Sequence, residues 1–191
     1  MALARRRPET KAQFDKLKAI IRRESLLTGG DFKLASGAQS SVFFDMKKTL
    51  FDPEGAALVG ELILEVIADD AVDYVGGLEL GAVPIATAVC VKSVGARRPL
   101  KGFFVRKEPK GHGTNKLVDG QFKDGADVIV LEDVTTTGGS SLKAVNAVRE
   151  RGAKVRKVVT IVDRLEGAEA TFAKEGIELV ALFDRNDFLE R

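Results

Sequence analysis

The stretch Val128-Ile-Val-Leu-Glu132-Asp133-Val-Thr-Thr-Thr-Gly-Gly-Ser140 passes from apolar residues to two acids, and then to a loop of hydroxyls and glycines. Its apolar start shows no alternation with polar residues, which is typical of a strand covered on both faces in a parallel sheet. Ligands of such sheets bind beyond the carboxyl ends of the strands. We therefore expect an α/β fold whose binding site includes Glu132 and Asp133.

The glycine-rich part of this stretch opens a helix that we expect from about Ser140. The first N–H groups of a helix are unpaired and lie at the positive end of its dipole, which suits a phosphate group. Thr136, Thr137 and Ser140 add hydroxyl donors. Glu132 and Asp133 are poor phosphate ligands, but they can accept hydrogen bonds from vicinal hydroxyls or share a metal ion with a sugar. A phosphate on the loop and a diol on the acids together describe a ribose 5-phosphate.

Apolar runs alternate with helical patterns along most of the chain. We expect strands at about 72–76, 101–106, 128–131, 155–162 and 177–183, with helices between them. This order favours a mainly parallel sheet with helices on both faces. A long polar loop, 107–121, exceeds an ordinary connection and is a candidate functional lid. The chain has no G-x-x-x-x-G-K-[ST], and no G-x-G-x-x-G follows its first parallel strand, so P-loop and dinucleotide folds are disfavoured.

The N-terminal part follows another pattern. An amphipathic helix starts at about Thr10, and Gly29-Gly30 are expected to stop it. Two short runs, 31–35 and 42–46, predict a β-hairpin. We expect a loose N-terminus at 1–9 and a single domain over 10–191, in which a small hood lobe of about 10–50 carries the hairpin.

The amino-acid composition excludes several classes of protein. The chain has 191 residues, of which 45% are hydrophobic, enough for one domain with a real core. Its 30 basic and 28 acidic residues leave a net charge of +2, which argues against a disordered chain or a nucleic-acid coat. The single cysteine, Cys90, excludes an internal disulfide. No apolar run suits a membrane helix and no signal-peptide stretch opens the chain, so we expect a cytoplasmic protein without nucleic-acid or membrane partners.

Several segments resemble one known family. Residues 128–140 resemble the phosphoribosyl pyrophosphate (PRPP) motif of type I phosphoribosyltransferases, and within that superfamily residues 20–183 most resemble the orotate phosphoribosyltransferase family. The stretch Val105-Arg-Lys-Glu-Pro-Lys-Gly-His-Gly113 resembles the mobile catalytic loop of that family. Val162-Asp-Arg-Leu-Glu-Gly167 resembles the segment that supplies its orotate-contacting arginine, and Phe43-Phe-Asp45 resembles the strand that lies against the base.

The resemblance implies a Rossmann-like type I phosphoribosyltransferase fold and a Mg²⁺-dependent reaction of orotate with PRPP, which gives orotidine 5′-monophosphate and pyrophosphate in UMP biosynthesis. The implied catalytic residues are Arg106, Lys107, Lys110 and His112. The implied PRPP-binding residues are Glu132, Asp133, Val134, Thr135, Thr136, Thr137, Gly138, Gly139 and Ser140, together with Glu79 and Leu80. The implied orotate-binding residues are Thr136, Arg164, Phe43 and Phe44. Because neighbouring strand residues face opposite ways, at most one of these two phenylalanines faces the base.

The family also implies how the site is completed. Mg²⁺ would be held mainly by substrate oxygens and water, and no metal ligand of the protein is certain. The loop 107–121 would be shared across the subunits of a homodimer. The Glu79–Leu80 peptide bond would be cis. An association with orotidine monophosphate decarboxylase is left open.

The chain departs from the family at the expected hairpin and pyrophosphate loop. Ala35 and Gly81 stand where one branch of the family has lysines, and either Lys47 or Lys48 is expected to supply the missing charge. Two alternatives remain: a phosphoribosyltransferase for another nucleobase, or a non-catalytic PRPP-binding regulator. Arg164 and the loop from Arg106 to His112 argue against the first alternative, and the presence of that loop argues against the second.

Overall fold

A computed structural model describes the chain except for residues 1, 5–7, 34–38, 97, 110–116 and 190–191. The strands are β1 (Ala2–Leu3), β2 (Leu26–Lys33), β3 (Gln39–Phe44), β4 (Tyr74–Leu78), β5 (Lys101–Val105), β6 (Val118–Gly120), β7 (Asp127–Thr135), β8 (Lys154–Asp163) and β9 (Glu178–Asp184). The α-helices are α1 (Lys11–Ile20), α2 (Met46–Leu50), α3 (Pro53–Val66), α4 (Ala82–Lys92), α5 (Gly139–Arg149) and α6 (Ala168–Lys174). Short 3₁₀ turns span Pro8–Thr10 and Arg185–Asp187.

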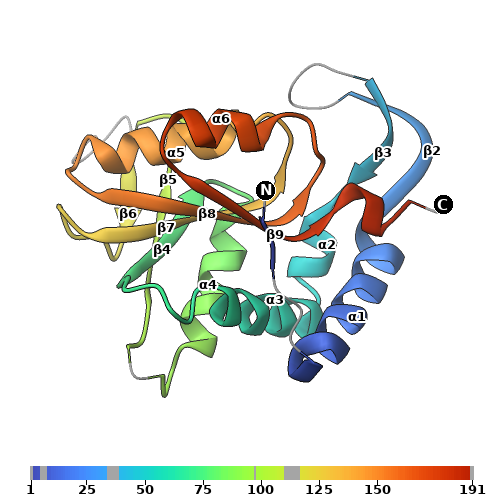
Figure 1. The fold of residues 1–191 in the computed structure, drawn as a ribbon, viewed down its shortest axis with the longest axis horizontal. Helices are drawn as coiled ribbons and strands as arrows, with labels where there is room; N and C mark the ends of the chain where they lie inside the picture. The colour runs from blue at the N-terminus through green and yellow to red at the C-terminus, as the bar shows by residue number, and fades with distance from the viewer. Residues whose placement is uncertain (1, 5–7, 34–38, 97, 110–116, 190–191) are drawn as a thin grey trace.

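The central sheet has the order β1-β9-β8-β7-β4-β5-β6, and every pairing in it is parallel except that of β5 with β6. Helices cover both faces of this sheet (Figure 1), with α5 and α6 on one face and α3 and α4 on the other. The expected fold class, a mainly parallel sheet between two helical layers, is confirmed.

Strand β7 shows why its sequence lacks alternation. Ile129 and Leu131 face the core that α1, α3 and α4 share, whereas Val128 and Val130 face the core under α5 and α6. A strand buried on both faces needs apolar residues at successive positions, because successive side chains point to opposite sides. The helix boundaries follow local signals as well. Asp52 caps α3 by accepting a hydrogen bond from the backbone N–H of Gly55 at 2.7 Å.

The N-terminal segment differs from the expectation in two ways. Residues 2 and 3 lie in the segment expected to be loose, yet they form β1, parallel to β9. The first helix does not continue to Gly29-Gly30. It passes through a π-helical segment, Ile21–Ser25, and β2 begins at Leu26. Pairing of Leu26 with Phe44 ends the helix before the glycines do.

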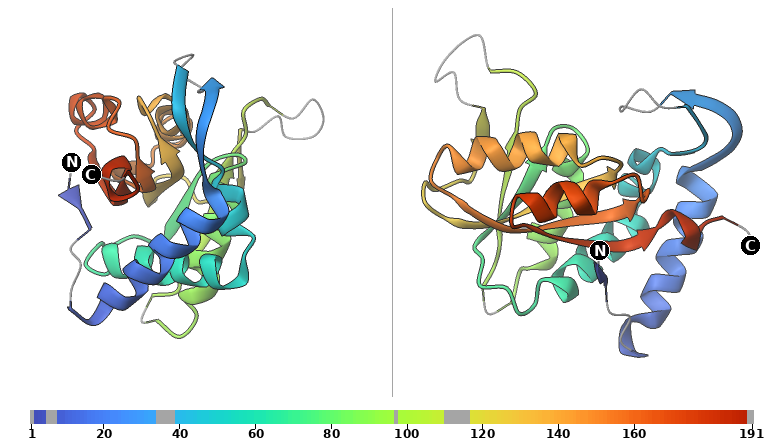
Figure 2. Two further views of the ribbon diagram at one scale, coloured as in Figure 1. Left: turned by 90° about the vertical axis from the view of Figure 1, so that its right-hand side faces the viewer. Right: turned by 45° about the horizontal axis from the view of Figure 1, so that its top comes forward.

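The hairpin forms a separate two-stranded antiparallel sheet, β2–β3, beside the main one (Figure 2). Both strands lie earlier in the chain than we expected. Gly29, at φ +78°, falls inside β2 where the register shifts between Thr28 and Phe32, so the glycine serves a bulge rather than a helix end. Met46, expected in the second strand, instead begins α2 with its side chain buried.

The long polar segment 107–121 contains one strand that the sequence did not predict. Residues Val118–Gly120 form β6, which pairs antiparallel with β5 at the edge of the sheet. Strand β7 is also longer than expected and runs through Glu132 and Asp133 to Thr135, because β8 continues to pair with it up to Asp163. Among the described residues, none of the helices combines the length and apolarity that crossing a bilayer requires.

Candidate active site

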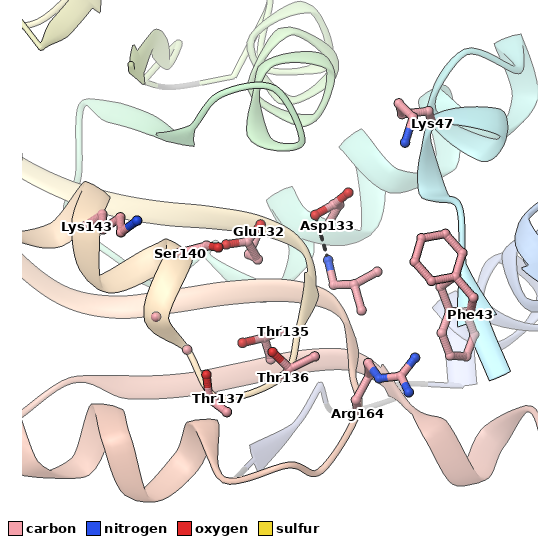
Figure 3. A pocket seen from close by; sticks show the side chains of 14 residues that line it. Phe43, Lys47, Glu132, Asp133, Thr135, Thr136, Thr137, Ser140, Lys143 and Arg164 are labelled. Atoms are coloured by element: carbon pink, nitrogen blue, oxygen red, sulfur yellow. Dashed lines mark hydrogen bonds between the residues drawn. The ribbon is translucent and has the colours of Figure 1, made fainter. Parts of the chain in front are cut away.

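A cavity of about 370 Å³ opens at the carboxyl ends of β7 and β8 and reaches across to the hairpin (Figure 3). Main-sheet elements and the hairpin both contribute to its wall. Its lining residues are Phe43, Phe44, Lys47, Glu132, Asp133, Val134, Thr135, Thr136, Thr137, Gly138, Gly139, Ser140, Lys143 and Arg164. The cavity therefore brings together the whole segment 132–140, the predicted base-binding arginine and the two hairpin phenylalanines.

The loop between β7 and α5 has the geometry of an anion site. Gly138 adopts φ +86°, a left-handed conformation that suits glycine, and α5 begins at Gly139. The first turn of α5 therefore lies at the cavity wall, and the first N–H groups of an α-helix have no partner within the helix. The buried hydroxyl oxygen of Thr135 has no hydrogen-bond partner among the described residues. Such a loop can receive a phosphate through backbone N–H groups and hydroxyls.

The two acids beside this loop differ in environment. Glu132 is buried, and its Oε2 accepts a hydrogen bond from the Ser141 hydroxyl at 2.7 Å. Burial, and then the charge of Asp133, raise the pKa of Glu132 to about 8. Asp133 is more accessible, and its Oδ1 accepts from the N–H of Val134 at 2.9 Å (Figure 3). Paired carboxyl groups of this kind can accept hydrogen bonds from adjacent hydroxyls of a sugar.

The turn after β4 passes directly beside the acids. A Cβ added at Gly81 would lie 2.7 Å from Asp133 Oδ1, so the absence of a side chain lets this turn approach the carboxylate. The peptide bond between Glu79 and Leu80 is cis, as the resemblance implied. A lysine at position 81, as in one branch of the family, would require the Asp133 carboxylate to move.

The first residues of the predicted catalytic loop lie outside the cavity lining. Arg106 donates to Asp119 Oδ2 at 3.0 Å, and the backbone N–H of Lys107 donates to Glu79 Oε1 at 2.9 Å. Glu79 thus joins the turn after β4 to the start of the loop, and Leu80 is 60% exposed and does not line the cavity. Lys110 and His112 lie outside the described residues, as does Ala35 of the hairpin.

The base-binding candidates lie at the hairpin side of the cavity. The Arg164 side chain is buried at the end of β8 and points toward Phe43 (Figure 3). Phe43 is half-buried and stacks on Phe32 at 5.6 Å, whereas Phe44 is buried and meets Phe188 edge to face at 5.2 Å. Phe43 is therefore the hairpin ring available to a planar base, although Phe44 also contributes to the lining.

Two lysines complete the cavity wall. Lys47 lines it and Lys48 does not, so Lys47 is the one of the two candidates that lies at this cavity. Its ammonium forms an ion pair with Asp45, and this contact raises the pKa of Lys47. Lys143 was missed by the sequence reasoning. It lies one helical turn after Gly139 in α5, so its side chain extends back toward the loop between β7 and α5. The i+4 spacing from the helix start was the signal that could have found it.

The fold and the cavity together define a phosphoribosyltransferase, and residues 47–186 match the family model described as phosphoribosyl transferase domain. An orotate phosphoribosyltransferase of Bradyrhizobium sp. (strain ORS 278) is 48% identical over 178 residues, which cover 91% of this chain and 96% of the relative. That of Methanocaldococcus jannaschii is 48% identical and covers 87% of this chain and 92% of the relative. The chain belongs to the orotate phosphoribosyltransferase family.

A solved structure agrees with this assignment. The Mycobacterium tuberculosis orotate phosphoribosyltransferase in complex with 5-phospho-alpha-D-ribosyl 1-diphosphate (PRPP) has a TM-score of 0.77 against this chain. The two are 34% identical, and the alignment covers 92% of this chain and 98% of that chain. A phosphoribosyltransferase from Corynebacterium diphtheriae, 34% identical, gives a TM-score of 0.82 and covers 93% of this chain and 98% of that chain.

Proposed function

We propose that this chain transfers the 5-phosphoribosyl group of PRPP to orotate, releasing pyrophosphate and orotidine 5′-monophosphate. One observation supports the proposal: a single cavity joins the hydroxyl- and glycine-rich loop at the start of α5, two adjacent acids, and a buried arginine beside an aromatic ring. A guanidinium can pair with a planar carboxylate such as that of orotate. A base without a carboxylate could not make this paired contact with Arg164.

Residues 136–140 would bind the 5′-phosphate, while Glu132 and Asp133 would hold the ribose hydroxyls. As the C1–O bond breaks, positive charge grows on the ribose and negative charge on the pyrophosphate. Glu79 and Leu80 lie in the turn that would approach the pyrophosphate through its backbone. Arg106, Lys107, Lys110 and His112 would stabilise the leaving charge when their loop closes, and closure would exclude water from the activated sugar.

Thr136 and Arg164 would orient the base so that its ring nitrogen lies in line with the C1–O bond. Phe43 would lie against the ring face, and Phe44 would support it from the core. This division of roles follows from burial, because Phe44 is 5% exposed and already packed on Phe188.

Mg²⁺ fits the donor set of this cavity. Within the described residues, no group of three or more His, Cys, Asp or Glu side chains gathers to hold a metal ion. Mg²⁺ usually takes one or two carboxylates and otherwise substrate oxygens and water, and Asp133 is the accessible carboxylate here. When bound with PRPP, the ion would neutralise charge on the pyrophosphate.

A homodimer is part of the same proposal. An apolar groove of about 500 Å³ lies between α3 and α4, and Phe51, Leu80 and Val91 on its rim are 73%, 60% and 65% exposed. Leu80 belongs to both this groove and the turn beside Asp133, so a second copy seated there would be continuous with the active site. Val91→Glu should give monomers in sedimentation velocity and reduce activity, because the loop 107–121 would lose its partner site.

Two further features of the proposal concern the cell. The single cysteine fits a reducing compartment such as the cytoplasm. Orotidine monophosphate decarboxylase acts on the nucleotide that this reaction releases, and co-sedimentation with that enzyme tests for an association.

The deciding experiment is a spectrophotometric assay of orotate consumption that depends on PRPP and Mg²⁺, run beside hypoxanthine, adenine and uracil. We expect turnover of orotate alone. Turnover of another base with orotate untouched would assign the chain to that base, and PRPP binding without any turnover would identify a regulator. Arg164→Ala should raise KM for orotate far more than KM for PRPP.

A further inference from the structure

The guanidinium of Arg164 donates three hydrogen bonds to other groups of the protein. Its Nε donates to Glu166 Oε1 at 2.9 Å, one terminal nitrogen donates to the backbone carbonyl of Val42 at 2.9 Å, and the other donates to the Ser40 hydroxyl at 2.8 Å. The side chain is only 4% exposed. A guanidinium has five N–H donors, so two remain for a substrate carboxylate.

Two of these bonds cross between the two sheets. Arg164 follows β8 of the main sheet, whereas Ser40 and Val42 belong to β3 of the hairpin, more than 120 positions earlier in the chain. The base of the hairpin is held separately, because Phe44 packs on Phe188. Ser40 lies four residues farther along the strand, roughly 13 Å from that anchor at the rise of a β-strand. Arg164 thus attaches the hairpin to the main sheet at a second point, farther from the base of the hairpin than Phe44.

The Ser40 hydroxyl is already oriented by its own strand. Its hydroxyl oxygen also accepts from the N–H of Val42 at 3.1 Å and lies 2.9 Å from the carbonyl of Val42, to which it donates. These two bonds orient the hydroxyl independently of its bond to Arg164. Glu166 fixes the opposite edge of the guanidinium at Nε. A side chain held at both edges loses little freedom when it binds a carboxylate, which favours affinity.

We propose that Ser40 and Glu166 are positioning residues for Arg164, and that Arg164 couples binding of the base carboxylate to the placement of the hairpin. This inference rests on the proposed function, in which Arg164 receives orotate. Because Phe43 lies on the same strand as Ser40 and Val42, the arginine also sets where the aromatic ring meets the base. Coupling is reciprocal, so a bound carboxylate stabilises the hairpin as much as the hairpin orients the arginine.

Steady-state kinetics of the full chain test the positioning roles. Ser40→Ala should raise KM for orotate about tenfold, as expected for one hydrogen bond to a charged group, and leave KM for PRPP and kcat within about twofold. Ser40→Thr, which keeps the hydroxyl, should recover most of the loss. Ser41→Ala is the matched control, since Ser41 is the exposed neighbour on the same strand.

Glu166 is tested in the same way. Glu166→Ala should raise KM for orotate about tenfold or more, because it removes a charged hydrogen-bond partner, and Glu166→Gln, which keeps an acceptor oxygen, should have a smaller effect. Glu175→Ala removes a more exposed and remote pair, in which Arg149 donates to Glu175 at 2.8 Å, and should leave both KM values unchanged. Equal rises in KM for both substrates in the Ser40 and Glu166 variants would overturn the proposal.

Hydrogen exchange separates this inference from the proposed function. In the substrate-free protein, amides of residues 39–44 should exchange faster in Arg164→Ala and Ser40→Ala than in the wild type or in Ser41→Ala. Unchanged exchange in Arg164→Ala would refute the coupling, whatever base the enzyme uses. Faster exchange without any effect of Arg164→Ala on KM for orotate would instead refute the orotate-binding role and leave the arginine as a structural tether.

Discussion

The buried carboxyl of Glu132 should make the stability of the substrate-free protein depend on pH. Burial and the neighbouring Asp133 raise its pKa from 4.5 to about 8. The folded protein therefore holds a proton that the unfolded chain releases above pH 4.5. Between these two values the unfolded state binds fewer protons, so the free energy of unfolding falls as pH rises and levels off above about pH 8.

The size of this effect follows from the shift. One pKa unit corresponds to about 1.4 kcal/mol, so the full interval from 4.5 to about 8 is linked to about 5 kcal/mol of unfolding free energy. Glu132→Gln removes the titration and keeps an oxygen to accept the Ser141 hydroxyl. The stability difference between the Gln variant and the wild type should therefore grow steadily from pH 5 to pH 8, in favour of Gln.

Urea denaturation at pH 5, 6, 7, 8 and 9 measures this difference, and Glu150→Gln, at an exposed position after α5, serves as the control. Ser141→Ala should shift the fall in unfolding free energy to higher pH than in the wild type, because the Ser141 hydroxyl lowers the pKa of Glu132. Parallel stability curves for the wild type and Glu132→Gln across the whole range would refute the reasoning. A difference that shrinks toward pH 8 would refute its sign.

Other predictions concern the cavity and one helix end. Gly81→Ala should raise KM for PRPP about fivefold with little change in Tm. The added Cβ would lie 2.7 Å from Asp133 Oδ1 and would displace that carboxylate. An unchanged KM for PRPP would contradict the role of this close approach. Lys143→Met should raise KM for PRPP about fivefold, because it removes a cation beside the loop between β7 and α5. Added salt should weaken this effect. Lys174→Met on α6 is the control and should leave KM for PRPP unchanged. Asp52→Ala should lower the unfolding free energy by about 1 kcal/mol in urea titration, since it removes the cap of α3.

Local sequence signals predicted most of the α/β core correctly. The apolar run at 128–131 and the Asp52-Pro53 helix start depend on neighbours a few residues away, and the structure follows both. The hairpin strands lie several residues earlier in the chain than their sequence pattern predicts, because Gly29-Gly30 fall inside β2 and do not end the helix. The register of Leu26 against Phe44 decides that boundary, and a glycine pair by itself does not distinguish a bulge from a stop.

The sequence alone determined the parallel sheet, the hydroxyl- and glycine-rich loop beside Glu132 and Asp133, and the family resemblance, because each of these depends on contiguous residues. Tertiary structure decided which distant groups share the cavity: Lys47 rather than Lys48, Lys143 on α5, and Phe43 rather than Phe44 as the accessible ring. It also decided that Arg164 bonds to the hairpin. These choices depend on the path of the folded chain and on burial, since a side chain's partners and its pKa are set by what packs around it and not by its neighbours in sequence.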